Sequence, residues 1–264
     1  MPDELSTAQK SYLKKCRKDK ISVTIARITL FVVFIVGWEL GSRLGIIDDF
    51  VFSSPSRLVK CFVSMLKGGI LFSHLWVTVW ETLVCFATVM CTALLLATLM
   101  WRFRFVFSVL EPYLVLLNSL PKSALAPVLI VWLGNNEKTI IIAAMSVAVF
   151  GAILSIYTCF ISTDPEKIKL IRTLGGKEHH ILFKLVIPAS IPVIINTMKV
   201  NLGLCLVGVI IGEFLAAKKG LGYLIIYGSQ VFKMDWVLLS IVILCLLSII
   251  LYEIISLIEK KISK

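Results

Sequence analysis

Residues 163–192 read TDPEKIKLIRTLGGKEHHILFKLVIPASIP, a polar and basic stretch between two long apolar runs. Asp164 can cap a helix, and Pro165 suits the first helical position. The glycines at 175 and 176 follow apolar residues at helical spacing, so they should end this helix, one of them with positive φ. A second short helix should lead to Pro188, which suits the start of a long helix. The stretch predicts a helix, a glycine turn and a helix at a membrane surface, able to dock a partner.

The composition of the chain is too apolar for an ordinary soluble domain. Hydrophobic residues make up 58% of the 264 residues, charged residues make up 16%, and the mean hydropathy is +0.95. These values place the chain in a membrane. The formal net charge of +11 does not indicate nucleic-acid binding, because the basic residues are scattered between apolar runs and form no stripe with interleaved aromatics.

The apolar runs predict an all-α polytopic membrane protein with six transmembrane helices. An apolar run of about twenty residues, rising about 1.5 Å per residue, crosses the bilayer core. The first run is interpreted as an uncleaved span and not a signal peptide, because it is long and no small-residue cleavage site follows it. Residues 55–67 should form an interfacial amphipathic helix outside the membrane. The predicted spans are residues 21–40, 75–101, 106–133, 139–160, 188–217 and 236–258.

The charge distribution predicts the orientation of these spans. Of the 27 Lys and Arg residues, seventeen fall on one side, counting Arg27 in the first span with the tail before it, and eight fall on the other; the remaining two are Lys122 and Lys199. The positive-inside rule then places both termini and the loop in the cytoplasm. The domain plan is a cytoplasmic tail (1–20), a six-span domain (21–258) with the loop at 163–187, and a second tail (259–264).

Five residues within the spans are candidates for a translocation path: Glu81, Pro121, Lys122, Pro127 and Glu213. The two prolines should break up the third span, which must therefore face protein or a cavity. A carboxylate such as Glu81 can be paired within the protein or can contact a ligand. Lys122 can snorkel within the bundle or contact substrate.

Cysteine and histidine give no metal or redox signal. The seven cysteines contain no CxxC pair and mostly lie in apolar runs, so they are interpreted as small core residues in preference to metal ligands. His179 and His180 are adjacent and cannot share a helix face for one metal ion.

The stretch at 163–192 resembles the cytoplasmic coupling loop, called the EAA loop, of ABC importer permeases. Gly175 matches the family's glycine, Leu185 its isoleucine, Ile187 its leucine and Pro188 its proline, while Lys169, Leu170 and Ile171 stand where Glu-Ala-Ala is usual. The resemblance implies a loop that contacts an ATPase. Its residues would be Lys169, Leu170, Ile171, Arg172, Gly175, Gly176, Leu185 and Pro188.

Two further stretches resemble the permease branch that imports nitrate, sulfonates, taurine and related small compounds. They are NSLPKSALAPVLIVWLG at 118–134 and GEFLAAKKGLGYLI at 212–225, the second leading to a partly re-entrant external segment. The resemblance implies a type I ABC importer-like subunit in a bacterial cell membrane. It would pair with a second permease copy, two ATPase subunits and an external solute-binding protein.

The chain lacks the motifs of an ATPase or a membrane enzyme. It has no GxxxxGK[ST] phosphate loop, so ATP and Mg²⁺ should bind only to the partner ATPases, and it has no HExxH or GxSxG motif. An ion-coupled secondary carrier is the alternative, although only Glu81 and Lys122 come near the mid-membrane sites that such carriers use. The solute is left open: a sulfonate, nitrate, taurine or a similar small compound, including vitamin precursors.

Overall fold

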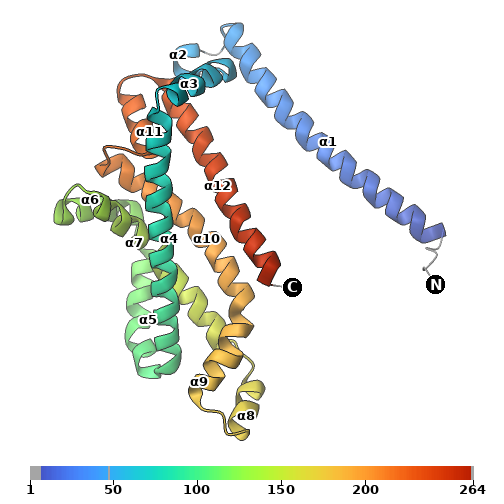
Figure 1. The fold of residues 1–264 in the computed structure, drawn as a ribbon, viewed down its shortest axis with the longest axis vertical. Helices are drawn as coiled ribbons and strands as arrows, with labels where there is room; N and C mark the ends of the chain where they lie inside the picture. Colours follow the sequence, from blue (N-terminus) through green and yellow to red (C-terminus); the bar gives the residue numbers. More distant parts are fainter. Residues whose placement is uncertain (1–6, 47, 263–264) are drawn as a thin grey trace. The chain divides into compact units, whose positions relative to one another are not determined.

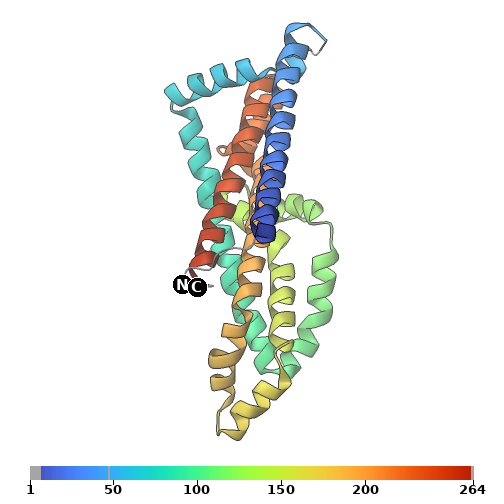
Figure 2. The same ribbon diagram turned by 90° about the vertical axis from the view of Figure 1, so that its right-hand side faces the viewer.

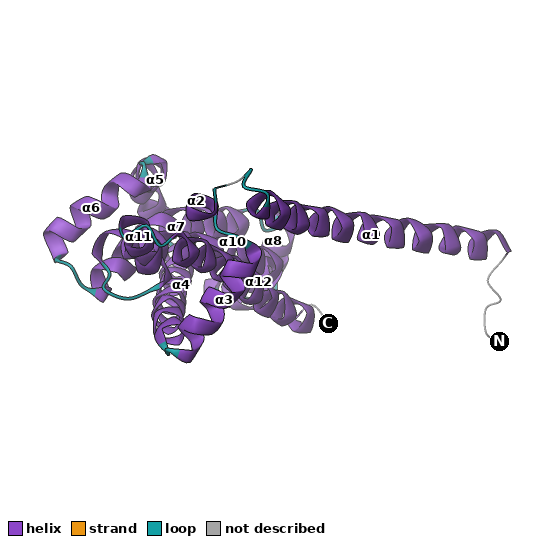
Figure 3. Ribbon diagram, turned by 90° about the horizontal axis from the view of Figure 1, so that it is seen from above, coloured by secondary structure: helices purple, strands orange, loops and turns teal. Residues whose placement is uncertain are grey.

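The computed structural model describes residues 7–46 and 48–262, and all regular secondary structure in them is helical (Figure 3). The chain divides into two compact units, residues 1–63 and 64–264. This division separates the first predicted span from the other spans.

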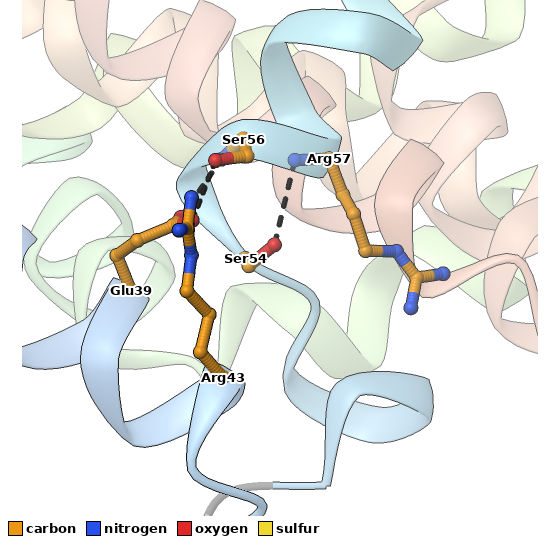
Figure 4. A network of polar contacts seen from close by, with 5 residues as sticks. All are labelled: Glu39, Arg43, Ser54, Ser56 and Arg57. Carbon is orange, nitrogen blue, oxygen red and sulfur yellow. Dashed lines mark hydrogen bonds and ion pairs between the residues drawn. The ribbon is translucent and has the colours of Figure 1, made fainter.

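The first unit contains α1 (Thr7–Arg43), α2 (Asp49–Phe52) and most of α3 (Pro55–Lys67). The helix α1 begins well before the predicted span, and α3 has the bounds that the sequence predicted. The carboxylate of Glu39 near the end of α1 accepts hydrogen bonds from the Ser56 amide (3.1 Å) and hydroxyl (2.6 Å) and pairs with Arg43 at 2.8 Å (Figure 4). Glu39 therefore caps the start of α3.

The second unit is built around three long helices, α4, α7 and α10, which pack against one another (Figures 1 and 2). In both views α8 and α9 lie at one end of this unit, beyond the C-terminal end of α12, and α11 lies toward the other. We call these the coupling end and the α11 end. The helices are α4 (Ile70–Arg102), α5 (Arg104–Ser119), α6 (Lys122–Leu133), α7 (Glu137–Ile161), α8 (Pro165–Thr173), α9 (Glu178–Ile181), the π-helix η1 (Leu182–Val186), α10 (Ile187–Ala216), α11 (Leu221–Gln230) and α12 (Met234–Ile262).

Small residues let α7 and α10 approach closely. Ala144, Ala148 and Ala152 recur every four residues on α7, and all three are fully buried. Ala144 faces α10, where a Cβ added to Gly208 would lie only 2.7 Å from the Cα of Ala144. Such small-residue seams are typical of helix pairs in membranes, where close backbone packing replaces the hydrophobic effect as the driving force.

Within the described residues, five helical segments are long and apolar enough to cross a membrane: 18–43, 70–102, 137–161, 178–216 and 234–261. The helices α5 and α6 qualify only as a pair bent by 107°. Counting this pair as one broken span gives the six predicted spans. The break lies at Pro121, as expected, whereas Pro127 lies inside α6 and does not interrupt it.

The predicted start of a long helix at Pro188 agrees with the structure to within one residue, because α10 begins at Ile187 and Pro188 lies in its first turn. A single helical segment runs from Glu178 to Ala216 and passes through the π-helix η1. Because proline has no N–H and its ring would clash with the carbonyl of Lys184 in a regular α-helix, the wider π-turn accommodates it. The Ile187 amide accordingly bonds the carbonyl of Leu182, five residues back.

Candidate functional site

The glycine turn of the coupling segment, residues 163–187, is a Schellman motif. Gly175 has φ +80°, and its amide donates to the Arg172 carbonyl at 3.0 Å. The Gly176 amide donates to the Ile171 carbonyl at 2.9 Å. These two bonds satisfy carbonyls that the end of α8 would otherwise leave without partners. The expectation of positive φ at one glycine is confirmed, at Gly175.

The two glycines are required for different reasons. Gly175 has the left-handed conformation, but a Cβ there would meet nothing within 4 Å. Gly176 has no unusual φ, but a Cβ there would lie 2.7 Å from the Ile171 carbonyl oxygen and would collide with the Ile171 side chain. At position 175 it is therefore backbone strain that disfavours other residues, and at position 176 it is the steric clash of any added side chain.

The start of α8 and the approach to α9 are fixed by local polar contacts. Asp164 accepts from the Glu166 amide at 2.9 Å, which is the predicted cap. Across the turn, Arg172 pairs with Glu178 at 3.0 Å, which ties α8 to α9. Both side chains are exposed, so the pair contributes at most about 1 kcal/mol.

One side of the coupling segment packs on the core, and another side is uncovered. Ile168, Ile171, Leu185 and Ile187 pack against the buried cluster. In contrast, Leu170 is 59% exposed, Leu174 78% and Phe183 66%. The exposed residues Lys169 and Arg172 flank Leu170. The segment thus combines a face anchored to the bundle with an exposed apolar and basic face.

At the α11 end, the segment Gly220–Gly222 wraps around the buried carboxylate of Glu213. The Thr78 hydroxyl and the Gly222 amide each donate to Glu213 at 2.6 Å. The Leu221 amide in turn donates to the Thr78 hydroxyl at 2.8 Å. These bonds attach the start of α11 to α4 and α10, and we call them the Glu213 latch.

A cavity of about 310 Å³ lies at the same end. Glu81 lines it from α4 and is only 1% exposed, yet neither of its carboxyl oxygens has a hydrogen-bond partner among the described residues. Glu81 lies one helical turn from Thr78, so its carboxyl group is on the same face of α4 as the Glu213 latch. The other polar residues that line this Glu81 cavity are Asn135, Asn136, Glu137, Lys218 and Lys219.

The two lysines within predicted spans both have partners in the chain. Lys122 donates to Asn118 at 3.3 Å across the break between α5 and α6. Lys199 on α10 pairs with Glu259 on α12 at 2.5 Å. Of the candidate path residues, the structure brings Glu81 and Glu213 together, while Pro121, Lys122 and Pro127 belong to the bent α5–α6 pair.

Sequence reasoning missed several residues around Glu81 and Glu213. Thr78 carried a usable signal, since a hydroxyl three residues before a span carboxylate shares its helix face. The backbone amides of Leu221 and Gly222 and the turn at 135–137 gave no such sequence signal, because they lie far from Glu81 in the sequence. Among the described residues, no group of three or more His, Cys, Asp or Glu side chains could hold a metal ion.

The comparisons with known proteins agree with this geometry. Residues 90–264 match the family model described as binding-protein-dependent transport system inner membrane component. The protein of Bacillus subtilis named as an aliphatic sulfonates transport permease, SsuC, is 24% identical over 90% of this chain and 86% of its own length. The formylaminopyrimidine transport permease ThiX of Halalkalibacterium halodurans is 26% identical over 73% and 76%. The riboflavin transport system permease RibX of Chloroflexus aurantiacus is 25% identical over 88% and 87%.

The fold is also that of solved permeases. A chain of the inward-facing MetNI methionine ABC transporter superposes with a TM-score of 0.64 at 17% identity, covering 72% of this chain and 94% of that one. An amino acid ABC transporter gives a TM-score of 0.62 at 17% identity, covering 76% and 98%. Because the family model matches well over half of the sequence, the chain belongs to the binding-protein-dependent permeases of ABC importers, and it is a membrane-embedded transport subunit and not an enzyme.

Proposed function

We propose that two copies of this chain form the translocation path of an ATP-driven importer. ATP and Mg²⁺ bind to two partner ATPases, and an extracytoplasmic binding protein delivers the solute. The family assignment supports an importer permease over an ion-coupled carrier. The candidate path residues of this proposal are Glu81, Pro121, Lys122, Pro127 and Glu213.

The solute belongs to a class of small compounds in this proposal: a sulfonate, nitrate, taurine or a vitamin precursor. The names of the relatives support the breadth of this class, since they refer to aliphatic sulfonates, a formylaminopyrimidine and riboflavin. Their identities of 24 to 26% do not select one solute.

The observation that carries the proposal is the exposed face of the coupling segment. Leu170 on α8 and Leu174, which caps its C-terminus, are four residues apart, and both are exposed at the end of the unit that projects beyond α12. Exposed apolar side chains beside basic ones are typical of the centre of a protein interface. The coupling segment continues directly into the helix that reaches the α11 end, so a force on the segment is transmitted along α10 as a rigid element.

The first prediction tests ATPase docking. Leu174→Ser should leave the abundance of the chain unchanged, because an exposed substitution changes stability by only about 0.5 kcal/mol. It should lower co-purification of the cognate ATPase by about tenfold, the effect of losing one well-packed interface residue. In the unmodified complex with its binding protein, ATP hydrolysis should rise with one of the proposed solute classes.

The matched control is Val231→Ser, an exposed apolar residue at the α11 end, which should co-purify normally. If Leu174→Ser and Leu170→Ser both retain the ATPase at the unmodified level, the coupling segment is a surface loop lying on lipid headgroups and the docking proposal is wrong.

The second prediction tests the orientation, with both termini and the coupling segment in the cytoplasm. Single cysteines at Lys177 and Lys219 should react with an impermeant thiol reagent only from inside and only from outside, respectively. Cys85 and Cys205 are fully buried and can remain, while the other five native cysteines are replaced. Reaction of both positions from one face of the membrane excludes the proposed topology.

A further inference from the structure

The Glu81 carboxyl group is a buried acid that the fold does not satisfy. It is 1% exposed, and neither oxygen has a hydrogen-bond partner among the described residues. A buried ionised group without a partner is strongly disfavoured, so such groups in folded proteins are normally paired, hydrogen-bonded or bound to an ion. Glu81 can be neutralised by a proton that it shares with Glu213, the neighbouring acid on α10, or by a cation that enters from outside the chain.

The neighbouring groups do not supply a positive charge. On α10, Glu213 is itself acidic, and its two oxygens accept one hydrogen bond each, from the Thr78 hydroxyl and the Gly222 amide. On α7, Glu137 adds a further acid to the cavity lining. On α4, the Nδ1 atom of His74 lies 3.0 Å from both the amide nitrogen and the carbonyl oxygen of Gly220.

The basic residues of the lining are exposed. Lys218 and Lys219 lie on the loop that follows α10, and both side chains are in contact with solvent. Neither of them hydrogen-bonds Glu81. The charge that lines the buried part of the cavity is therefore negative, and the lysines are available to a solvent-exposed or anionic portion of a bound molecule.

We propose that the Glu81 cavity binds a small monovalent cation, either an alkali ion or the ammonium group of a small amine, with the Glu81 carboxylate as its charged ligand. A monovalent cation balances the one uncommitted carboxylate, whereas a divalent ion requires several oxygen ligands and more negative charge. The described residues contain no group of three or more carboxylate, imidazole or thiol side chains for such an ion. The volume of about 310 Å³ accommodates a hydrated ion or a small amine.

The position of the cavity gives the cation a structural consequence. Glu81 and the latch residue Thr78 share one face of α4, and the latch holds the start of α11. A cation at Glu81 neutralises the repulsion between the two buried carboxylates, so its binding should stabilise the α11 end. This inference goes beyond the proposed transport function and does not require it.

The test measures the thermal unfolding of the purified full chain in nanodiscs at constant neutral pH and ionic strength. Sodium, potassium and methylammonium chlorides are titrated against tetraethylammonium chloride, whose bulky cation has no N–H to donate and cannot approach a carboxylate closely. We expect a saturable rise of the unfolding midpoint by roughly 5 °C with at least one of the three. A response to sodium or potassium identifies an ion site, and a response to methylammonium alone identifies an ammonium site.

Two variants locate the effect. Glu81→Gln removes the charge and should abolish the response to cations, and in tetraethylammonium it should unfold at a higher temperature than the unmodified chain. Glu111→Gln, at an exposed carboxylate on α5, should keep the response. Equal midpoints of the unmodified chain in all four salts overturn the proposal, because Glu81 is then a neutral acid that needs no cation. A cation response that persists in Glu81→Gln also overturns it.

If Glu81→Gln does not fold, covalent labelling of the unmodified chain replaces it. Dicyclohexylcarbodiimide adds to a protonated carboxyl group to give a stable acylurea, which peptide mass spectrometry can locate at Glu81. The stabilising cation should slow this labelling and tetraethylammonium should not. Equal labelling rates contradict a cation at Glu81, and this result is independent of whether the chain couples to an ATPase.

Discussion

Gly176→Ala should abolish solute transport while leaving the chain at normal abundance in the membrane. The added Cβ would lie 2.7 Å from the Ile171 carbonyl oxygen, which accepts the Gly176 amide in the Schellman motif. Relieving this contact breaks a hydrogen bond and redirects α9, at a cost of about 1–3 kcal/mol. A cost of that size lowers the population of the native turn by roughly fivefold to 150-fold. Insertion should survive, because the spans and their flanking charges are unchanged.

The measurement is transport by proteoliposomes that contain the ATPase and the binding protein, with ATP hydrolysis recorded in parallel. Gly175→Val should behave like Gly176→Ala, because a β-branched residue is strongly disfavoured at φ +80°. Gly175→Asn is the matched control: asparagine tolerates this conformation, and its side chain has open space. Unmodified transport rates for both Gly176→Ala and Gly175→Val would show that the turn has no role in coupling.

Local chemistry made the coupling segment predictable from the sequence. The cap at Asp164, the proline at 165 and the glycine pair each act within a few residues, so the sequence contains all the atoms that form them. The bounds of α3 were predictable for the same reason. The sequence did not show that α10 continues from α9 through η1, because a proline near the start of a separate helix and a proline after a π-turn look alike in sequence.

The sites at the α11 end were not predictable, because residues far apart in the sequence form them. Thr78 and Glu213 are separated by 135 positions, and the cavity lining combines α4, the turn before α7 and the loop after α10. The sequence identified Glu81 and Glu213 as unusual acids in apolar runs, but it could not show that the backbone and Thr78 hydrogen-bond Glu213 and leave Glu81 without such bonds. That difference decides which acid is structural and which is available to a ligand.

Gly220→Ala should strongly destabilise the α11 end, because it violates two separate requirements of the Glu213 latch. Gly220 has φ +121° and ψ 163°, a conformation that is essentially restricted to glycine and costs other residues about 1–3 kcal/mol. The added Cβ would also collide with the Glu213 carboxyl group. Displacing that carboxyl group breaks its bonds to Thr78 and Gly222 and leaves a buried charge partly unsatisfied, which adds at least about 1–3 kcal/mol.

The measurement is reversible unfolding of the chain in mixed micelles, with Gly203→Ala as the control. Gly203 lies inside α10, and a Cβ there meets nothing within 4 Å, so its replacement should change stability little or raise it slightly. The double variant Gly220→Ala/Glu213→Ala separates the two requirements. Removing the Glu213 side chain gives the new Cβ room. Only the backbone strain at Gly220 should then add to the cost of Glu213→Ala. The double variant should therefore lose less stability than the sum of the losses in the two single variants. If the losses of stability in the two single variants add exactly in the double variant, the Glu213 carboxyl group and position 220 do not interact. The backbone conformation alone would then determine the geometry of the Glu213 latch.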